Sequence, residues 1–461
     1  MSLPSPLPTL PPSFPIYWRG DLHYEHARIG RVFNHRRPDR YPLAVVEAKR
    51  EEHIVEAVKL ANELKCRVSI RSGGHSWAAW SVRDDAILID LGKYYELSYD
   101  AETHIAKVSP SITGRMLNTL LGHHGRLFPG GHCPDVGIGG FALQGGMGWN
   151  CKNWGWACER VLGVDVVTAN GELVHCDKYE NTDLYFAARG AGPVTRFYLQ
   201  TLPVFSCMRS AAYFYKKEDY RKAASWITKI AEDYDQDTEI VTVSSFPGGG
   251  DELRVMVLLV TFKNSEEEAR KALQVAEDSH PAGNVDGWFM KPTSLQSEYD
   301  DQAAANPEGH RYCVDNAYID NDADVVSVME KAFTTLPTKK SFTLWYSMAP
   351  CSRRPLPDMA LSMQSDHYLA LYTVWEHKHD DAGNRGWVQN IMQDVEKQSV
   401  GAYLGDSDFQ VRQTRFWGQE QGQRLMKIRK ERDPQGRICG FLDARDNSGA
   451  DGLPNEHHWL Q

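Results

Sequence analysis

The chain has 461 residues, nine cysteines and a formal net charge of −10, and 42% of its residues are hydrophobic. This composition predicts a folded globular protein with two or three domains, and it excludes a disordered chain, a collagen and a coiled coil. The negative charge argues against a nucleic-acid-binding protein, and no run of about 18 apolar residues predicts a membrane span. We therefore expect neither nucleic acid nor membrane among its partners.

The N-terminal arm and lead-in, residues 1–38, contain six prolines between Pro4 and Pro15. This stretch lacks the positive and apolar regions of a signal peptide, so we expect a cytoplasmic protein. An odd number of cysteines without a CxxC pair fits reduced thiols in that compartment.

Residues 39–205 predict a first domain of short strands and helices. Buried strands are expected at residues 43–48, 66–70, 86–91 and 105–108, helices at 51–65 and 113–124, and a hairpin over 161–176 around Asn170-Gly171. Glycine-rich segments interrupt these elements: RSGGHS at 71–76, GGHCPDVGIGG at 130–140 and QGGMG at 144–148.

Residues 206–400 have a different pattern, with long strands between amphipathic helices. Strands are expected at residues 208–215, 239–245, 253–262, 312–319, 341–348 and 367–376, and helices at 219–234, 265–278, 324–335 and 385–398. The lack of βαβ regularity predicts an α+β substrate domain built on a large antiparallel sheet. Residues 401–461 form a C-terminal segment rich in glycine, aspartate and charged residues.

The glycine-rich segments predict a site for a phosphate-bearing cofactor. Glycine lets backbone N–H groups approach an anion closely, and two such loops in one half of the chain strengthen this interpretation. Residues 137–142 also match the GxGxxA pattern of dinucleotide-binding folds. That pattern requires a buried strand directly before it, whereas Pro129, Gly130, Gly131 and Pro134 precede it here. We therefore treat the match as accidental.

Four segments carry a family resemblance: RSGGHSW (71–77), PGGHCPDVGIGGFALQGGMGW (129–149), VLGVDVVTANGELV (161–174) and RFWGQEQGQRLMKIRKERDPQGRI (415–438). Together they resemble the vanillyl-alcohol-oxidase / p-cresol methylhydroxylase (PCMH) superfamily and, within it, the berberine-bridge-enzyme-like oxidases. The resemblance extends from about residue 40 to 445. It implies an α+β fold in which residues 39–205 form a PCMH-type FAD-binding domain and the C-terminal segment returns to it.

The resemblance also implies how FAD is held. His75 matches the histidine that bonds to the flavin 8α-methyl group, and Cys133 matches the cysteine that bonds to flavin C6 in bicovalent members. Imidazole and thiolate are natural nucleophiles for an electron-poor flavin ring. The remaining cofactor-binding residues implied by the motifs are Arg71, Ser72, Gly73, Gly74, Ser76, Val136, Gly137, Gly139, Gly140, Gly145, Gly146, Gly148 and Val167.

Two stretches depart from the family pattern. Cys151 and Lys152 stand where a serine and an arginine are usual, which puts polar contacts there in doubt. The segment after Gly190 is four or five residues shorter than usual before Val194, which could weaken FAD binding.

The candidate catalytic residues come from the same comparison with the family. The position of the family's acidic base falls on Ala370 or Leu371, so that base is absent. Tyr403 is the leading candidate for deprotonating or orienting the substrate, and it would need a lowered pKa to act as a base. Tyr372 and Tyr346 are secondary candidates, because alternate residues of a strand face one side of the sheet.

The sequence therefore predicts an FAD-dependent oxidase of secondary metabolism, acting on a small-molecule alcohol, phenol or amine. Molecular oxygen would accept the electrons and give hydrogen peroxide. A flavin dehydrogenase with low oxygen reactivity and a degenerate, non-catalytic flavin-fold protein remain alternatives. No metal site is expected, because the pair His377 and His379 lacks a third ligand. Nothing in the sequence indicates an oligomeric state.

Overall fold

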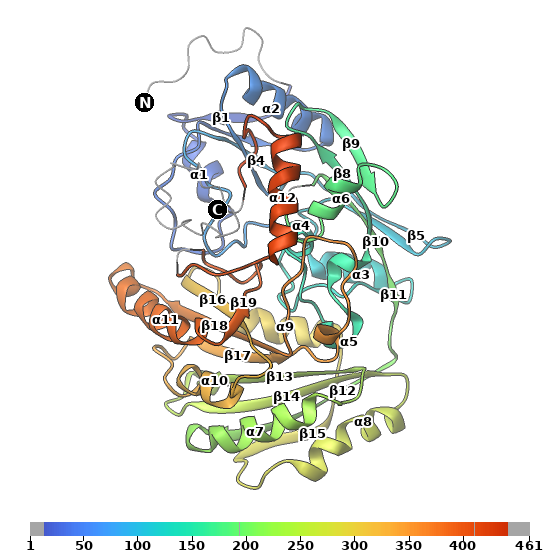
Figure 1. The fold of residues 1–461 in the computed structure, drawn as a ribbon, viewed down its shortest axis with the longest axis vertical. Helices are drawn as coiled ribbons and strands as arrows, with labels where there is room; N and C mark the ends of the chain where they lie inside the picture. Colours follow the sequence, from blue (N-terminus) through green and yellow to red (C-terminus); the bar gives the residue numbers. More distant parts are fainter. Residues whose placement is uncertain (1–12, 193, 410, 441–461) are drawn as a thin grey trace.

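The computed structural model describes residues 13–192, 194–409 and 411–440, and within them the chain has an α+β fold (Figure 1). Most of the proline-rich arm and the last part of the C-terminal segment lie outside the described residues. In the view of Figure 1 the N-terminal half forms the upper part of the molecule and a large sheet the lower part.

The first sheet of the upper part has strand order β1-β2-β4-β3, with β2, β4 and β3 parallel. Helix α2 covers it because Ile54, Val58 and Ala61 recur at helical spacing and are buried against the strands. The elements are β1 (Ile16–Trp18), α1 (Tyr24–Ile29), β2 (Ala44–Glu47), α2 (Glu51–Glu63), β3 (Val68–Arg71) and β4 (Ile87–Asp90).

The second sheet has strand order β5-β6-β10-β8-β9 and is antiparallel throughout. Its strands are β5 (Leu97–Asp100), β6 (Ile105–Val108), β8 (Val161–Val167), β9 (Leu173–Asp177) and β10 (Arg196–Gln200), and α3 (Gly114–Gly122) and α4 (Ile138–Leu143) pack on them. The strand nearest before α4 is the short β7 (Arg126–Leu127), which pairs only with β11 (Leu202–Pro203). The segment before α4 is thus irregular, as expected from its glycines and prolines, and a dinucleotide-binding βαβ unit is absent there.

The large sheet has strand order β15-β12-β14-β13-β17-β18-β16-β19. Its strands are β12 (Cys207–Lys216), β13 (Thr238–Ser245), β14 (Arg254–Lys263), β15 (Asp286–Thr293), β16 (Arg311–Ile319), β17 (Phe342–Ser347), β18 (His367–Trp375) and β19 (Ser399–Gly401). One face is covered by α7 (Tyr220–Ala231), α8 (Glu266–Ser279), α10 (Val325–Thr334) and α11 (Asp381–Glu396). The other face turns toward the upper part, and on β18 the side chains of Tyr368, Ala370 and Tyr372 point that way.

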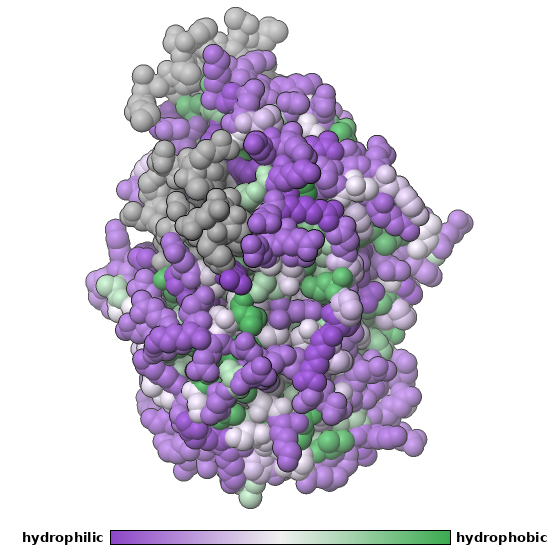
Figure 2. Space-filling view, in the orientation of Figure 1, coloured by the Kyte–Doolittle hydropathy of each residue, from purple (hydrophilic) through white to green (hydrophobic). Residues whose placement is uncertain are grey.

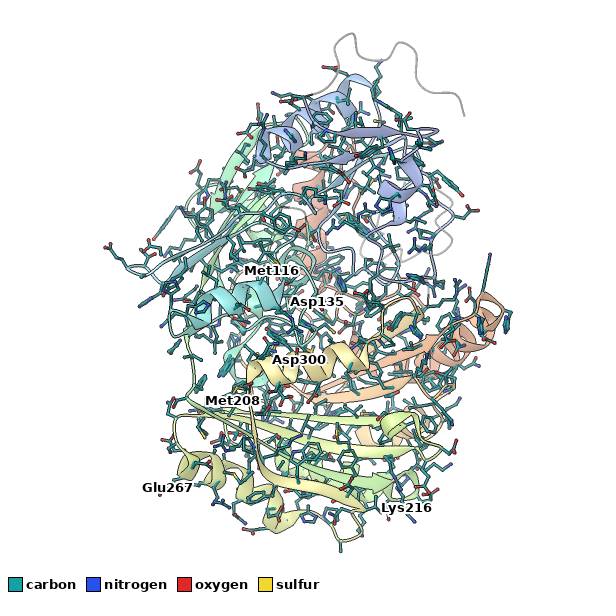
Figure 3. All side chains as sticks on the ribbon, turned by 180° about the vertical axis from the view of Figure 1, so that it is seen from behind. Met116, Asp135, Met208, Lys216, Glu267 and Asp300 are labelled. Carbon is teal, nitrogen blue, oxygen red and sulfur yellow. The ribbon has the colours of Figure 1, made fainter. Side chains whose placement is uncertain are left out.

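Several elements do not follow from the hydrophobic pattern. Strand β15 is an edge strand whose residues are partly or fully exposed, so it has no buried side to produce a strand signal. Helix α9 (Leu295–Ala305) likewise buries only two residues, Glu298 and Tyr299. Its Asp300 accepts a hydrogen bond from Arg115 of α3 at 2.9 Å, and Figure 3 shows Asp300 between Met116 of α3 and the large sheet.

Helix α12 (Gln419–Arg432) brings the C-terminal segment back to the upper part. It lies beside α6 (Thr182–Ala187), where Arg432 pairs with Asp183 at 2.7 Å (Figure 1). The face shown in Figure 2 is mainly hydrophilic, with hydrophobic residues in scattered groups. Within the described ranges, no helix has the length and apolar character that crossing a membrane requires.

Candidate functional site

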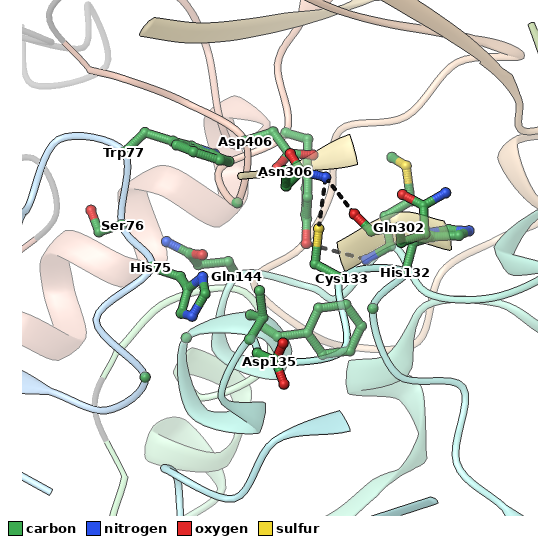
Figure 4. A pocket seen from close by; sticks show the side chains of 18 of the residues that line it. His75, Ser76, Trp77, His132, Cys133, Asp135, Gln144, Gln302, Asn306 and Asp406 are labelled. Atoms are coloured by element: carbon green, nitrogen blue, oxygen red, sulfur yellow. Dashed lines mark hydrogen bonds between the residues drawn. The ribbon is translucent and has the colours of Figure 1, made fainter. Parts of the chain in front are cut away.

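A cavity of about 1500 Å³ lies between the upper part and the inner face of the large sheet. It is lined by loop residues 71–76 and 131–137, by tyrosines of the large sheet, and by the loop that follows β19. Figure 4 shows His75, Cys133 and Asp406 around this cavity. Both glycine-rich loops and the C-terminal segment thus reach one site.

The first glycine loop begins where β3 ends at Arg71. The Arg71 side chain is buried away from solvent and donates to Asp90 Oδ2 at 3.0 Å and to the Arg28 carbonyl oxygen at 2.6 Å. Arg71 therefore anchors the loop with its side chain, and the residues beyond it are the part of the loop available to a cofactor.

The backbone amides of residues 72–76 line this cavity without hydrogen-bond acceptors among the described residues. Glycine at position 73 lets this loop lie close to the second glycine segment, since a Cβ at Gly73 would lie only 2.7 Å from the Gly137 nitrogen. Gly74 has a φ of +82°, which favours glycine. Unpaired amides on glycine-rich turns are the donors that an anionic pyrophosphate requires, so the residues present fit FAD.

His75 follows this turn and its ring stacks on Phe33, with ring centroids 4.7 Å apart. Burial lowers the pKa of His75 to about 4. The imidazole is therefore neutral at physiological pH, and a ring nitrogen keeps the lone pair that a nucleophile needs.

Cys133 reaches the cavity from the second glycine segment. The Asn306 amide, in the turn after α9, donates to Cys133 Sγ at 3.7 Å, as the dashed line in Figure 4 marks. Burial raises the pKa of the Cys133 thiol to about 12, so it stays protonated at neutral pH.

The other predicted cofactor-binding residues fall into two groups. Those that line the cavity are Ser72, Gly73, Gly74, Ser76, Val136, Gly137, Gly139 and Gly140. Gly145, Gly146, Gly148 and Val167 are not among the lining residues. A Cβ at Gly148 would lie 2.1 Å from the Pro129 carbonyl oxygen, so this glycine serves close packing within its own loop. Val167 is buried in the core beneath α2.

All three candidate tyrosines, Tyr403, Tyr372 and Tyr346, line the cavity. The surroundings of Tyr403 do not lower its pKa: burial and then the Asp406 carboxylate raise it. Its hydroxyl oxygen accepts from the amides of Gly146 and Met147 at 3.1 and 3.2 Å. Tyr403 is therefore a positioned neutral phenol, and the expectation of a tyrosine base is not met by the residues around it.

The sequence reasoning missed the carboxylates of the cavity, and two of them contact its tyrosines. Asp406 accepts from the Tyr368 hydroxyl at 2.8 Å, and burial raises its pKa. Glu239 of β13 is 3% exposed and accepts from Asn150 N at 2.6 Å. Asp406 lies only three residues after Tyr403, a signal that the sequence contained, whereas Glu239 sits on a strand without a motif.

Glu239 also fixes two side chains of the cavity wall. It accepts from the Tyr346 hydroxyl at 2.7 Å, and its Oε1 lies 2.9 Å from His132 Nε2. Burial lowers the pKa of His132, but the attraction of Glu239 outweighs this effect and the net change is upward. All hydrogen-bonding partners of this carboxylate are thus protein groups.

The two departures from the family pattern, at Lys152 and after Gly190, differ in whether they line the cavity. Lys152 is fully buried and its Nζ donates to the Ala231 carbonyl oxygen at 3.1 Å, so it joins the two parts of the molecule and does not line the cavity. The residues on both sides of position 193 do line the cavity, and the Trp417 indole donates to the Gly190 carbonyl oxygen at 3.0 Å. The described residues contain no cluster of side chains suited to a metal ion.

Comparisons with known proteins agree with this geometry. Residues 42–177 match the family model of the FAD binding domain. The chain is 40% identical over 441 residues to the FAD-linked oxidoreductase penO of Penicillium crustosum, which covers 94% of this chain and 98% of that protein. The FAD-linked oxidoreductase nodO of Hypoxylon pulicicidum is 37% identical over 438 residues, or 93% of this chain and 98% of the relative.

Solved structures share the fold at low identity. BBE-like 1 of Physcomitrella patens superposes with a TM-score of 0.82 at 19% identity, covering 97% of this chain and 98% of its own. A chitooligosaccharide oxidase superposes with a TM-score of 0.76 at 19% identity, covering 92% and 95%.

Proposed function

Because this chain belongs to the FAD-linked oxidoreductases, with a berberine-bridge-enzyme-like fold, we propose that it oxidises a small-molecule alcohol, phenol or amine with FAD held covalently through His75 and Cys133. When bound, FAD supplies the acceptor for the hydride of the substrate's C–H bond. We propose molecular oxygen as the final acceptor, which yields hydrogen peroxide.

One observation carries this proposal. Two nucleophilic side chains from separate loops, His75 and Cys133, line the same cavity as the unpaired amides of residues 72–76. The amides supply donors for the pyrophosphate and the neutral imidazole supplies a nitrogen lone pair. Because Cys133 is held as a thiol, we expect its bond to flavin to form more slowly than that of His75.

The cavity wall favours a largely apolar substrate. Tyr346, Tyr368, Tyr372 and Leu344 of the large sheet face it, so aromatic and aliphatic surface is available beside a few polar groups. The xylooligosaccharide oxidase of Thermothelomyces thermophilus is 40% identical over only 163 residues, or 33% of its length. We therefore do not propose a carbohydrate substrate for this chain.

Acid precipitation of the purified protein tests the covalent link. We expect a yellow pellet from wild type, and from His75→Ala and Cys133→Ala we expect flavin attached through the remaining residue, as located by peptide mass spectrometry. The double variant should release all flavin to the supernatant. His123→Ala and Cys66→Ala, which change an exposed histidine and a thiol outside the cavity lining, serve as matched controls.

A colourless wild-type protein would contradict the proposal and favour the degenerate, non-catalytic protein. Covalent flavin in the double variant would contradict the assignment of the two residues. For the acceptor, the enzyme is mixed with benzyl alcohol, 4-hydroxybenzyl alcohol and benzylamine, and hydrogen peroxide is measured in air. Anaerobic flavin bleaching that is not followed by peroxide in air would favour the dehydrogenase instead.

A further inference from the structure

A carboxylate without a lysine or arginine partner among the described residues, Asp406, faces the cavity from the loop after β19. Asp406 lines the cavity, and no lysine or arginine of the described residues forms an ion pair with it. Asp408, two residues further along the chain, does not line the cavity and forms an ion pair with Arg36; its side chain is fully buried. The loop thus uses one aspartate to hold the structure and presents the other to the cavity, where Figure 4 shows it near Asn306.

The surroundings of Asp406 suit a group that takes up and releases a proton. Burial raises its pKa, and hydrogen bonds from Tyr368, Tyr372 and Trp77 pull the pKa partly back. A carboxyl group with a pKa above its ordinary value is a better proton acceptor than an exposed one, because general bases work best near the operating pH. The phenol donors also orient the carboxylate at the cavity wall.

Other cavity groups fit this role less well. The Tyr403 hydroxyl oxygen is occupied by two backbone amides and its pKa is raised. Glu239 is 3% exposed and its oxygens accept from His132, Asn150 and Tyr346. Tyr403 and Glu239 are both almost fully buried, whereas Asp406 is only half-buried at the cavity wall.

We propose that Asp406 is the proton acceptor of the oxidation, taking the proton from the hydroxyl or amine group of the bound substrate. The proton moves to a carboxylate oxygen, the neighbouring C–H bond gives its hydrogen and two electrons to the flavin, and the carbon–heteroatom bond becomes a double bond. This inference rests on the proposed function, since it assumes an oxidation at this cavity.

Several groups act on Asp406, and all of them remain in place in the Asp406→Asn variant. The Tyr368 and Tyr372 hydroxyls come from β18, while the other groups come from the two glycine-rich regions and from its own loop. Those groups are Trp77, His132, Cys133 and Tyr403.

The first test follows anaerobic flavin bleaching against pH with the three probes named above. We expect Asp406→Asn to keep the flavin absorbance but to bleach about 10²–10⁴-fold more slowly, without the rise with pH that ionised Asp406 gives wild type. Tyr368→Phe removes a donor that stabilises the carboxylate, so its profile should move to higher pH. Asp322→Asn, at an exposed position of the large-sheet domain, should behave as wild type.

The second test needs no substrate. The pKa of Asp406 is raised in the folded protein, so the folded state holds this proton more tightly than the unfolded state. Wild type should therefore lose stability relative to Asp406→Asn as the pH rises from about 4 through the folded-state pKa. The melting temperature of both proteins is recorded across that range.

The outcomes separate this inference from the proposed function. Colourless protein in both wild type and variant would overturn the proposed function itself. Flavin-loaded Asp406→Asn that bleaches within threefold of wild type would overturn the role of Asp406. If none of the probes bleaches the wild-type flavin, the stability test decides. A melting-temperature difference between wild type and Asp406→Asn that does not change with pH overturns the inference. A wild-type melting temperature that falls relative to that of Asp406→Asn as the pH rises supports it.

Discussion

At the scale of single residues, Tyr403 is held more by the backbone than by other side chains. Its hydroxyl oxygen accepts from the amides of Gly146 and Met147 and the residue is 4% exposed. Tyr403→Phe leaves two buried N–H groups without an acceptor, so we expect the free energy of unfolding to fall by about 1–3 kcal/mol. Chemical denaturation of the flavin-loaded protein measures this change.

The control for this prediction is Tyr215→Phe, because Tyr215 does not line the cavity. Its hydroxyl donates at 3.1 Å to the Pro281 carbonyl oxygen, so its loss leaves no N–H group without an acceptor. We expect a change below about 1 kcal/mol there. If Tyr403→Phe unfolds with the wild-type free energy, the two amides do not depend on this hydroxyl, and Tyr403 has another role.

At the scale of elements, α4 is pressed at Gly139 against Pro110, which follows β6, and against the first glycine loop. A Cβ there would lie 2.5 Å from Pro110 Cβ and 3.0 Å from Ser72 Oγ, whereas a Cβ at Gly140 would first meet Ser72 Oγ at 3.9 Å. We expect Gly139→Ala to lower the free energy of unfolding by about 1–3 kcal/mol, because the added methyl group forces backbone shifts. Gly140→Ala should be neutral or stabilising by up to about 1 kcal/mol, since alanine favours a helix.

Gly139→Ala and Gly140→Ala make the same change in the same helix and differ in the room for the added methyl group, so each serves as the control for the other. Equal effects on thermal unfolding would show that helix propensity, and not the contact with Pro110, decides the outcome. The flavin content of each variant then reports whether the same contact also positions the amides of residues 72–76.

The elements differ in how far the sequence determines them. The strands of the large sheet are predictable because their inward and outward residues alternate or are buried on both sides, as in β18. The edge strand β15 and helix α9 escape prediction because they bury few residues, and their places depend on contacts such as Arg115 with Asp300. Motifs likewise locate His75 and Cys133, but they assign Val167 to a cavity from which packing under α2 separates it.

At the scale of the whole molecule, residues 150–152 join the cofactor half to the large sheet. The Asn150 amide donates to Glu239 Oε2 at 2.6 Å and Lys152 Nζ donates to the Ala231 carbonyl oxygen at 3.1 Å. The motif comparison marks Lys152 only as a departure from the family pattern, because only the three-dimensional arrangement brings the end of α7 to it. Both contacts fix the wall that carries Glu239 and Tyr346 relative to the glycine loops.

This joint makes stability depend on pH in a way that can be measured. Burial lowers the pKa of Lys152 from 10.5 to about 8 in the folded protein, so between pH 8 and 10.5 the unfolded chain holds a proton that the folded chain lacks. Wild type should therefore gain about 2–3 kcal/mol relative to Lys152→Met as the pH rises from 8 to 10. The free energies of unfolding of both proteins are compared at these two values, with Lys229→Met, at an exposed lysine of α7, as the control for loss of a positive charge. A difference that stays constant with pH would mean that the Lys152 amine is hydrated at the joint and that its bond to Ala231 adds little to the hold between the two halves.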